Sequence, residues 1–148
     1  AERLEPSTLV ARRIGRERMI VCAAPSYLAK HGEPKTPEDL LRHNCLRIAS
    51  LHRVWTFRSG RNTSKLTISG SLITDNIVML RQATIDGIGL ARLPTSVASA
   101  DLQAGFLRQV LPDYTLGEPN VFIVHPYGKH MPTKVRAVID GLVRRFER

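Results

Sequence analysis

Apolar positions recur along this chain with the period of helices in some stretches and of strands in others. The clearest helical pattern is Lys134–Phe146, whose apolar residues fall at i, i+3, i+4, i+7, i+8 and i+11. Arg136, Asp140 and Arg144 follow one another at i, i+4 on the opposite face. We expect an amphipathic helix that covers a sheet, and the basic face leaves a membrane-surface helix open as the alternative.

The stretch Ser71–Pro94 predicts a strand, a helix and a second strand. Asp75 is a residue type that caps helix N-termini, and apolar residues follow it at helical spacing. Gly87 stands where a helix end favours a left-handed residue, and the apolar run that follows stops at Pro94. A strand–helix–strand unit of this length is typical of a right-handed parallel crossover.

Small ligands in such sheets bind beyond the carboxyl ends of the strands, next to helix N-termini. That rule makes Thr74, Asp75 and Asn76 candidate pocket residues. Helix N-termini also attract anions through free backbone amides and the helix dipole. Ser71 and Thr74 would add hydroxyl donors there, whereas the Asp75 carboxylate would repel an anion unless it caps the helix.

Shorter patterns predict the remaining elements. Strands are expected at Ser7–Ile14, Glu17–Ala24, Cys45–Ala49, Val54–Phe57, Lys65–Thr74, Leu107–Leu111 and Val121–Val124. Short helices are expected at Ser26–His31, from Thr36 to His43 and at Pro94–Ala100, with a hairpin turn at Ser59–Asn62 and a loop at Asp101–Gly105. Because strands and helices alternate, the fold class is α/β.

Length and charge narrow the class of protein. A chain of 148 residues forms one domain or two small lobes, and its formal net charge is +9. The basic residues are scattered and aromatic residues make up only 5%. We therefore favour a solvated basic surface, or a fragment whose acidic part is missing, over binding to nucleic acid or anionic lipid. The longest apolar run, Met19–Pro25, is too short to span a bilayer, and no secretory signal is visible. We therefore expect a cytoplasmic protein without a membrane partner.

The residues that could carry chemistry form no recognised constellation. Cys22 and Cys45 stand among apolar neighbours and are expected to be buried, reduced thiols. The histidines lack metal-ligand spacing, and there is no G-x-S-x-G elbow. Gly87-Ile88-Gly89 lies between a helix and the next strand, the reverse of a dinucleotide-binding loop. We expect no enzyme, no cofactor and no metal site.

Several motifs in order resemble the effector-binding domain of LysR-type transcriptional regulators. They are LVARRIGRERMIVCAAPSYLAKHGEPKTPEDLLRHNCLRI, WTF, TDN, GIGLARLP, LRQVLPDY and VFIVHPYGKHMPTKVRAVIDGLVRRF. The resemblance implies two Rossmann-like lobes of the periplasmic-binding-protein type (type 2), with the first lobe incomplete. The second lobe would be 21–120, and 1–20 with 121–148 would be part of the first. The winged helix-turn-helix of the family is absent from this chain, which is expected to be a truncated regulator.

The resemblance also implies a small-molecule effector in the cleft between the lobes, with organic acids as one candidate class. Its matching positions are Ser7, Thr8, Ala24, Pro25, Thr74, Asp75, Asn76, His125 and Pro126. Arg92 replaces the usual aliphatic residue and could bind an acid or form a surface ion pair. The resemblance also implies assembly as a homodimer or homotetramer, and DNA as a partner only through the absent N-terminal domain. A solute-binding protein fragment of the same fold is the alternative.

Overall fold

The computed structural model describes residues 10–117, 120–125 and 132–146, and the chain divides into two compact units. One unit combines Ala1–Glu17 with Glu118–Arg148, and the other is continuous over Arg18–Gly117. The predicted second lobe, 21–120, begins and ends three residues later than the continuous unit. Each unit is described below by itself.

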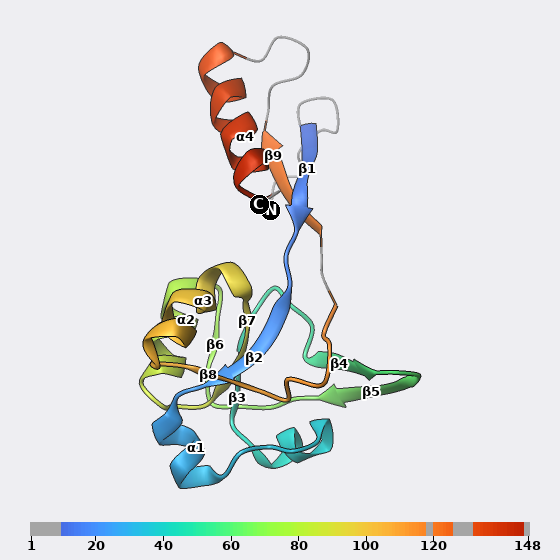
Figure 1. Ribbon diagram of the computed structural model, residues 1–148, viewed down its shortest axis with the longest axis vertical. Helices are drawn as coiled ribbons and strands as arrows, with labels where there is room; N and C mark the ends of the chain where they lie inside the picture. The colour runs from blue at the N-terminus through green and yellow to red at the C-terminus, as the bar shows by residue number, and fades with distance from the viewer. Residues whose placement is uncertain (1–9, 118–119, 126–131, 147–148) are drawn as a thin grey trace. The chain divides into compact units, whose positions relative to one another are not determined.

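The continuous unit, Arg18–Gly117, is built on a five-stranded sheet with the order β6-β3-β7-β2-β8 (Figure 1). Its strands are β2 (Met19–Ala23), β3 (Cys45–Ile48), β6 (Ile73–Thr74), β7 (Leu90–Pro94) and β8 (Arg108–Val110). β3 runs parallel to both β6 and β7, whereas β2 is antiparallel to β7 and β8. The predicted strand–helix–strand unit is β6–α2–β7, with β3 between its two strands, and the parallel crossover is confirmed.

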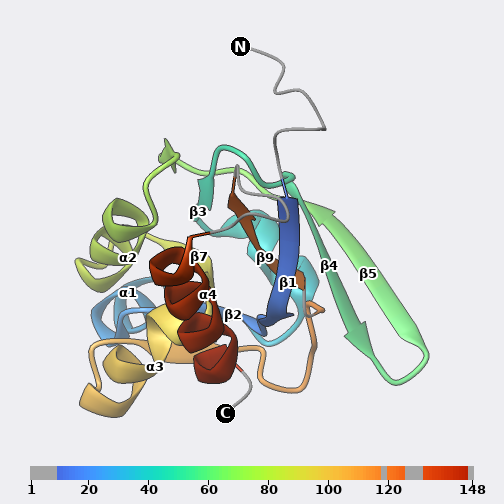
Figure 2. The ribbon, with the colours of Figure 1, turned by 90° about the horizontal axis from the view of Figure 1, so that it is seen from above.

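Helices cover one face of this sheet and a mixed layer covers the other (Figures 1 and 2). The first layer holds α2 (Ile77–Ile85) and α3 (Thr95–Ala104), and its core is called here the Leu80 cluster. The second layer holds α1 (Pro25–His31), the 3-10 helix η2 (Pro37–Arg42) and the hairpin β4 (Val54–Ser59)–β5 (Asn62–Thr67), and its core is the Trp55 cluster.

Side-chain alternation assigns four of the five residues of β2 to the two clusters. All five residues of β2 are buried: Val21 and Ala23 join the Trp55 cluster, and Ile20 and Cys22 join the Leu80 cluster. This is the period of two that a strand imposes. It explains why the run Met19–Pro25 is apolar throughout, since both faces of the strand are covered.

The ends of the helices follow the sequence signals in part. Gly32 closes α1 with a φ of 85°, and a capping box between Thr36 and Asp39 opens η2, although that element is a 3-10 helix. The predicted loop at Asp101–Gly105 is wrong for its first four residues, because α3 continues to Ala104. The Asp101 carboxylate is buried and accepts two hydrogen bonds from Arg81 on α2, at 2.6 and 2.7 Å, which holds the last turn of α3 against α2.

The single strand predicted over Lys65–Thr74 is also wrong. β5 ends at Thr67, and only Ile73 and Thr74 form a second strand. Between them Gly70 passes directly over the carbonyl group of Cys45, where an added Cβ would overlap the carbonyl oxygen. The chain turns around the start of β3 at this point, and only a glycine allows so close an approach.

The discontinuous unit contains an antiparallel pair of strands and a helix. β1 (Val10–Arg16) pairs with β9 (Asn120–His125), with a shift of register between Arg13 and Gly15. The strand predicted at Ser7–Ile14 therefore ends two residues later than expected, at Arg16. α4 (Thr133–Phe146) packs on β1 and buries Ile139, as expected of a helix that covers a sheet, although Val138 is 63% exposed. Among the helices of the described ranges, none has the length and apolar character needed to cross a bilayer.

Asn44, directly before β3, bonds two loops of the continuous unit to the start of that strand. Its Nδ2 donates to Ser71 Oγ at 2.8 Å and to the Ile88 carbonyl at 2.9 Å, and its Oδ1 accepts from the Ser71 backbone amide at 2.7 Å. Its own carbonyl accepts from the amide of Leu90 at 2.9 Å. One side chain therefore fixes the loop before β6 and the turn before β7 relative to β3.

Replacing Asn44 should destabilise the protein. Asn44→Ala removes three side-chain hydrogen bonds, so we expect the free energy of unfolding to fall by about 2–3 kcal/mol in urea titrations. Gln103→Ala is the matched control, since Gln103 is exposed on α3 and the substitution should change stability by less than about 0.5 kcal/mol. Equal midpoints for the two variants would contradict the role of Asn44.

Candidate functional site

The carboxyl edge of the sheet is where the sequence places the candidate pocket residues. β3 and β7 are parallel, so their carboxyl ends meet at one edge. β6 ends at Thr74, which pairs with Ile48 at the end of β3, and α2 begins three residues later. Thr74, Asp75 and Asn76 therefore lie together at this edge, beside the N-terminus of α2, where α/β sheets bind ligands.

The residue that caps α2 is Asn76, and the prediction of Asp75 as the cap is wrong. Asn76 Oδ1 accepts hydrogen bonds from the backbone amides of Val78 at 2.9 Å and Met79 at 3.2 Å. The physical reason is one of position, since a cap must directly precede the first helical residue, Ile77. Asp75 stands one residue too early and its side chain is exposed.

This capping changes what the tip of α2 offers to an anion. The amides of Val78 and Met79 are already engaged by Asn76. The Thr74 hydroxyl is buried and accepts from the backbone amide of Asn76 at 3.1 Å. The tip therefore has fewer free donors than the sequence suggested, and a ligand at this edge needs further contacts to bind.

Ala24 and Pro25, two further predicted site residues, do not lie at this edge of the continuous unit. Ala24 is buried as the N-cap of α1, and Pro25 opens that helix. Because β2 is antiparallel to β7, its last residues lie at the opposite, amino edge of the parallel strands. His125 ends β9 in the discontinuous unit and pairs with Val10, while Ser7, Thr8 and Pro126 lie outside the described residues.

Arg92 on β7 is half-buried and lies over the ring of Trp55. Its Cζ is 5.7 Å from the centroid of the Trp55 ring, and its Nε is buried without a hydrogen-bond partner. Burial lowers the pKa of Arg92 from its ordinary value. Among the described residues no ion pair involves it, so the surface ion pair considered as one option does not form there.

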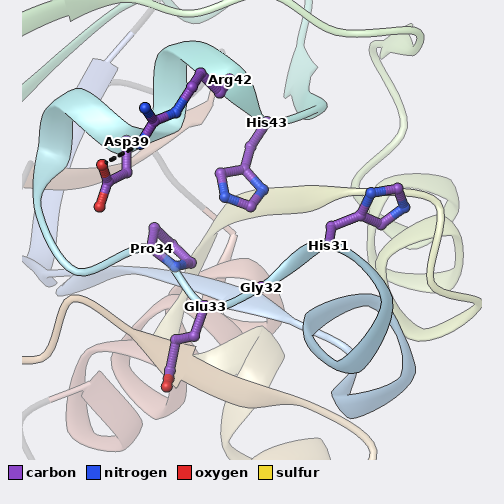
Figure 3. A pocket seen from close by; sticks show the side chains of 7 residues that line it. All are labelled: His31, Gly32, Glu33, Pro34, Asp39, Arg42 and His43. Carbon is purple, nitrogen blue, oxygen red and sulfur yellow. Dashed lines mark hydrogen bonds and ion pairs between the residues drawn. The ribbon is translucent and has the colours of Figure 1, made fainter.

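A shallow pocket of about 340 Å³ opens at the other edge, near the start of β3 (Figure 3). It lies between the end of α1 and η2, and His31, Asp39, Arg42 and His43 are among its lining residues. Burial lowers the pKa of His43, whose Nδ1 is 2.8 Å from the Tyr27 hydroxyl. Asp39 is engaged by the cap of η2 and by Arg42 at 2.7 Å. The main charged groups of this pocket are thus already paired with the protein.

The two thiols are buried, as the sequence indicated, and neither is activated. Burial, with a smaller contribution from the negative charge of Asp101, raises the pKa of Cys22 to about 12. Burial alone raises the pKa of Cys45 to about 12. A thiolate nucleophile needs the opposite environment. Among the described residues, no group of three His, Cys, Asp or Glu side chains could hold a metal ion.

Capping of α2 can be tested with two neighbouring substitutions. Asn76→Ala should lower the free energy of unfolding by about 1 kcal/mol, because two amides of the first turn lose their acceptor. Asp75→Ala is the matched control and should change it by less than about 0.5 kcal/mol. Urea unfolding of both variants measures the two changes in stability. A larger loss of stability in Asp75→Ala than in Asn76→Ala would contradict the assignment of Asn76 as the cap.

Both cysteines should be inert while the protein is folded. With a pKa of about 12, roughly one thiol in ten thousand is ionised at pH 8. We expect no reaction with a chromogenic disulfide reagent within an hour in the native state, and release of two equivalents in urea. Rapid labelling of either cysteine in the native protein would show that its burial is wrong.

Comparison with known proteins places this architecture in one family. The family model described as the LysR substrate binding domain matches residues 1–147. An HTH-type transcriptional regulator of Xanthomonas campestris is 31% identical over 149 residues, which cover 97% of this chain and 43% of the relative. The regulator DmlR of Escherichia coli is 30% identical over 141 residues, covering 93% of this chain and 46% of the relative. The chain thus spans about half the length of the curated relatives it matches.

Solved structures agree with this result. The regulatory domain of CrgA, a LysR-type transcriptional regulator from Neisseria meningitidis, has a TM-score of 0.82 at 28% identity, covering 99% of this chain and 72% of that one. Full-length AphB of Vibrio cholerae has a TM-score of 0.78 at 28% identity, covering 96% of this chain and 49% of that one. The fold is the two-lobed, type 2 periplasmic-binding-protein fold of these regulatory domains, and the family consists of transcriptional regulators rather than enzymes. The chain belongs to the LysR substrate-binding domain family.

Proposed function

We propose that this chain is the effector-sensing and dimerisation domain of a bacterial LysR-type DNA-binding transcriptional regulator. The observation that carries the proposal is the family match over residues 1–147, together with relatives that are HTH-type transcriptional regulators about twice as long as the matched part. These relatives also favour a regulator over the alternative of a solute-binding protein fragment. DNA would be bound through an N-terminal winged helix-turn-helix that lies outside this sequence.

The effector is proposed to bind at the carboxyl edge of the sheet, beside Thr74, Asp75 and Asn76. The geometry supports this place because two parallel strands end there and α2 begins there. From the discontinuous unit, the resemblance offers Ser7, Thr8, His125 and Pro126 as further contacts. Ala24 and Pro25 lie at the opposite edge, so the proposal does not depend on them.

The partners follow from the same assignment. The effector is a small molecule, and organic acids are the class we favour, since the chain carries a net charge of +9. The regulator works as a homodimer or homotetramer in the cytoplasm. Effector binding shifts the balance between open and closed arrangements of the lobes, which requires different affinities for the two states.

A thermal-shift screen tests the proposal. The panel contains small carboxylic acids, aromatic acids and their neutral amides, measured on this chain and on the complete regulator. A ligand at a hundred times its Kd stabilises the native state by about 2.7 kcal/mol, which raises the midpoint by roughly 5–10 °C for a chain of this size.

The neutral amides and an inorganic salt at equal ionic strength are the controls for unspecific effects. A panel in which no compound shifts the midpoint of the complete regulator would contradict the proposal.

A further inference from the structure

Two arginines project from the same face of the sheet at its carboxyl edge. On β3, Cys45 belongs to the Trp55 cluster and Leu46 to the Leu80 cluster, so the next residue, Arg47, faces the Trp55 side. On β7, Leu90 and Ala91 alternate in the same way, so Arg92 faces that side too. The contact of Arg92 with Trp55 agrees with this assignment.

The register of the parallel strands β3 and β7 relates these two residues. Cys45 lies beside Leu90 and Leu46 beside Ala91, and the next residues on the two strands, one step beyond the last paired residues, are Arg47 and Arg92. Adjacent strands are about 4.8 Å apart, which sets the spacing of the two backbones. Arg47 also pairs with Ile73, the residue before Thr74, so it lies beside the strand that leads into α2. The two arginines face the Trp55 side of the sheet, whereas α2 packs on the Leu80 side.

No carboxylate of the described residues neutralises this pair. Neither arginine takes part in an ion pair or hydrogen bond of its side chain there, although each is half-buried. On the other side of Arg92, β2 offers the apolar Val21. The Arg92 guanidinium group has a buried Nε without a hydrogen-bond partner and has lost part of its solvation. A bound anion would offset this penalty.

We propose that Arg47 and Arg92 form the anion-binding element of the effector site and select a small dicarboxylate. The guanidinium fork matches a carboxylate in a bidentate manner, and two cations balance two carboxylates. The cation–π contact with the Trp55 ring holds the Arg92 side chain in position. This inference rests on the proposed function, because it assigns the ligand class of the same edge of the sheet.

Titration calorimetry with malonate, succinate, glutarate and adipate at fixed ionic strength is the test. At least one of these acids should bind, while butyrate should bind about tenfold more weakly than succinate and succinamide should not bind. Arg47→Gln and Arg92→Gln should each weaken the tightest acid by about tenfold or more. Arg92→Lys keeps the charge without the fork and should give an intermediate loss.

Arg108→Gln is the matched control for net charge. Arg108 is exposed on β8 of the same sheet and pairs with Ala23 at the amino edge, so its loss should change the affinity by less than about twofold. Unfolding midpoints without ligand show that each variant is folded, and Arg47→Gln provides the test should Arg92→Gln fail to fold.

Three results would overturn the inference. They are a failure of all four acids to bind, an equal loss of affinity in Arg108→Gln, and phosphate bound as tightly as the best acid. Binding of another compound of the screening panel, unchanged in Arg47→Gln and Arg92→Gln, would overturn this inference alone and leave effector sensing intact. Absence of any ligand for the complete regulator would contradict the proposed function as well.

Discussion

The close packing around the start of β3 is the constraint on which the continuous unit depends. The backbone of Asn44 and Cys45 passes between two glycines, Gly70 and Gly89, each so near that a Cβ would overlap a carbonyl oxygen. The Asn44 side chain then bonds the loops on both sides. Because β3 lies between β6 and β7 and is parallel to both, this packing sets the register of three strands at once. Everything at the carboxyl edge, from Thr74 to Arg92, is placed by that register.

Local signals in the sequence predicted those helix ends and turns that depend on the backbone conformation of one or two residues. Gly32 and Gly87 have positive φ and end helices where predicted, and the hairpin turn at Ser59–Asn62 joins β4 to β5. The turn after α2 has the two hydrogen bonds of a Schellman motif, from Gly87 to Thr84 and from Ile88 to Ala83. These features depend only on residues that are close together in the sequence, so the sequence alone predicts them.

The parts that the sequence did not predict depend on contacts between distant residues. α3 keeps its last turn because Asp101 meets Arg81, twenty residues earlier, and no local pattern shows that pairing. Asp75 and Asn76 are both good capping types, and only the first helical residue decides between them. Arg47 passed unnoticed because a strand pattern read along the chain does not show which residue lies on the neighbouring strand. The alternation of Cys45 and Leu46 carried the signal for its face, but its position relative to Arg92 needed the register of β3 and β7.

A sensor must also bind its ligand differently in its two states. A ligand held only by groups of the continuous unit would bind open and closed arrangements equally and shift neither, however tight its binding. The two arginines lie on strands of one unit, so they would supply affinity and charge selection without favouring one state. Discrimination between the states would then have to come from other groups than these two arginines. Affinity and signalling are separable on this account, because the groups that select the charge of the ligand need not be the groups that distinguish the two states.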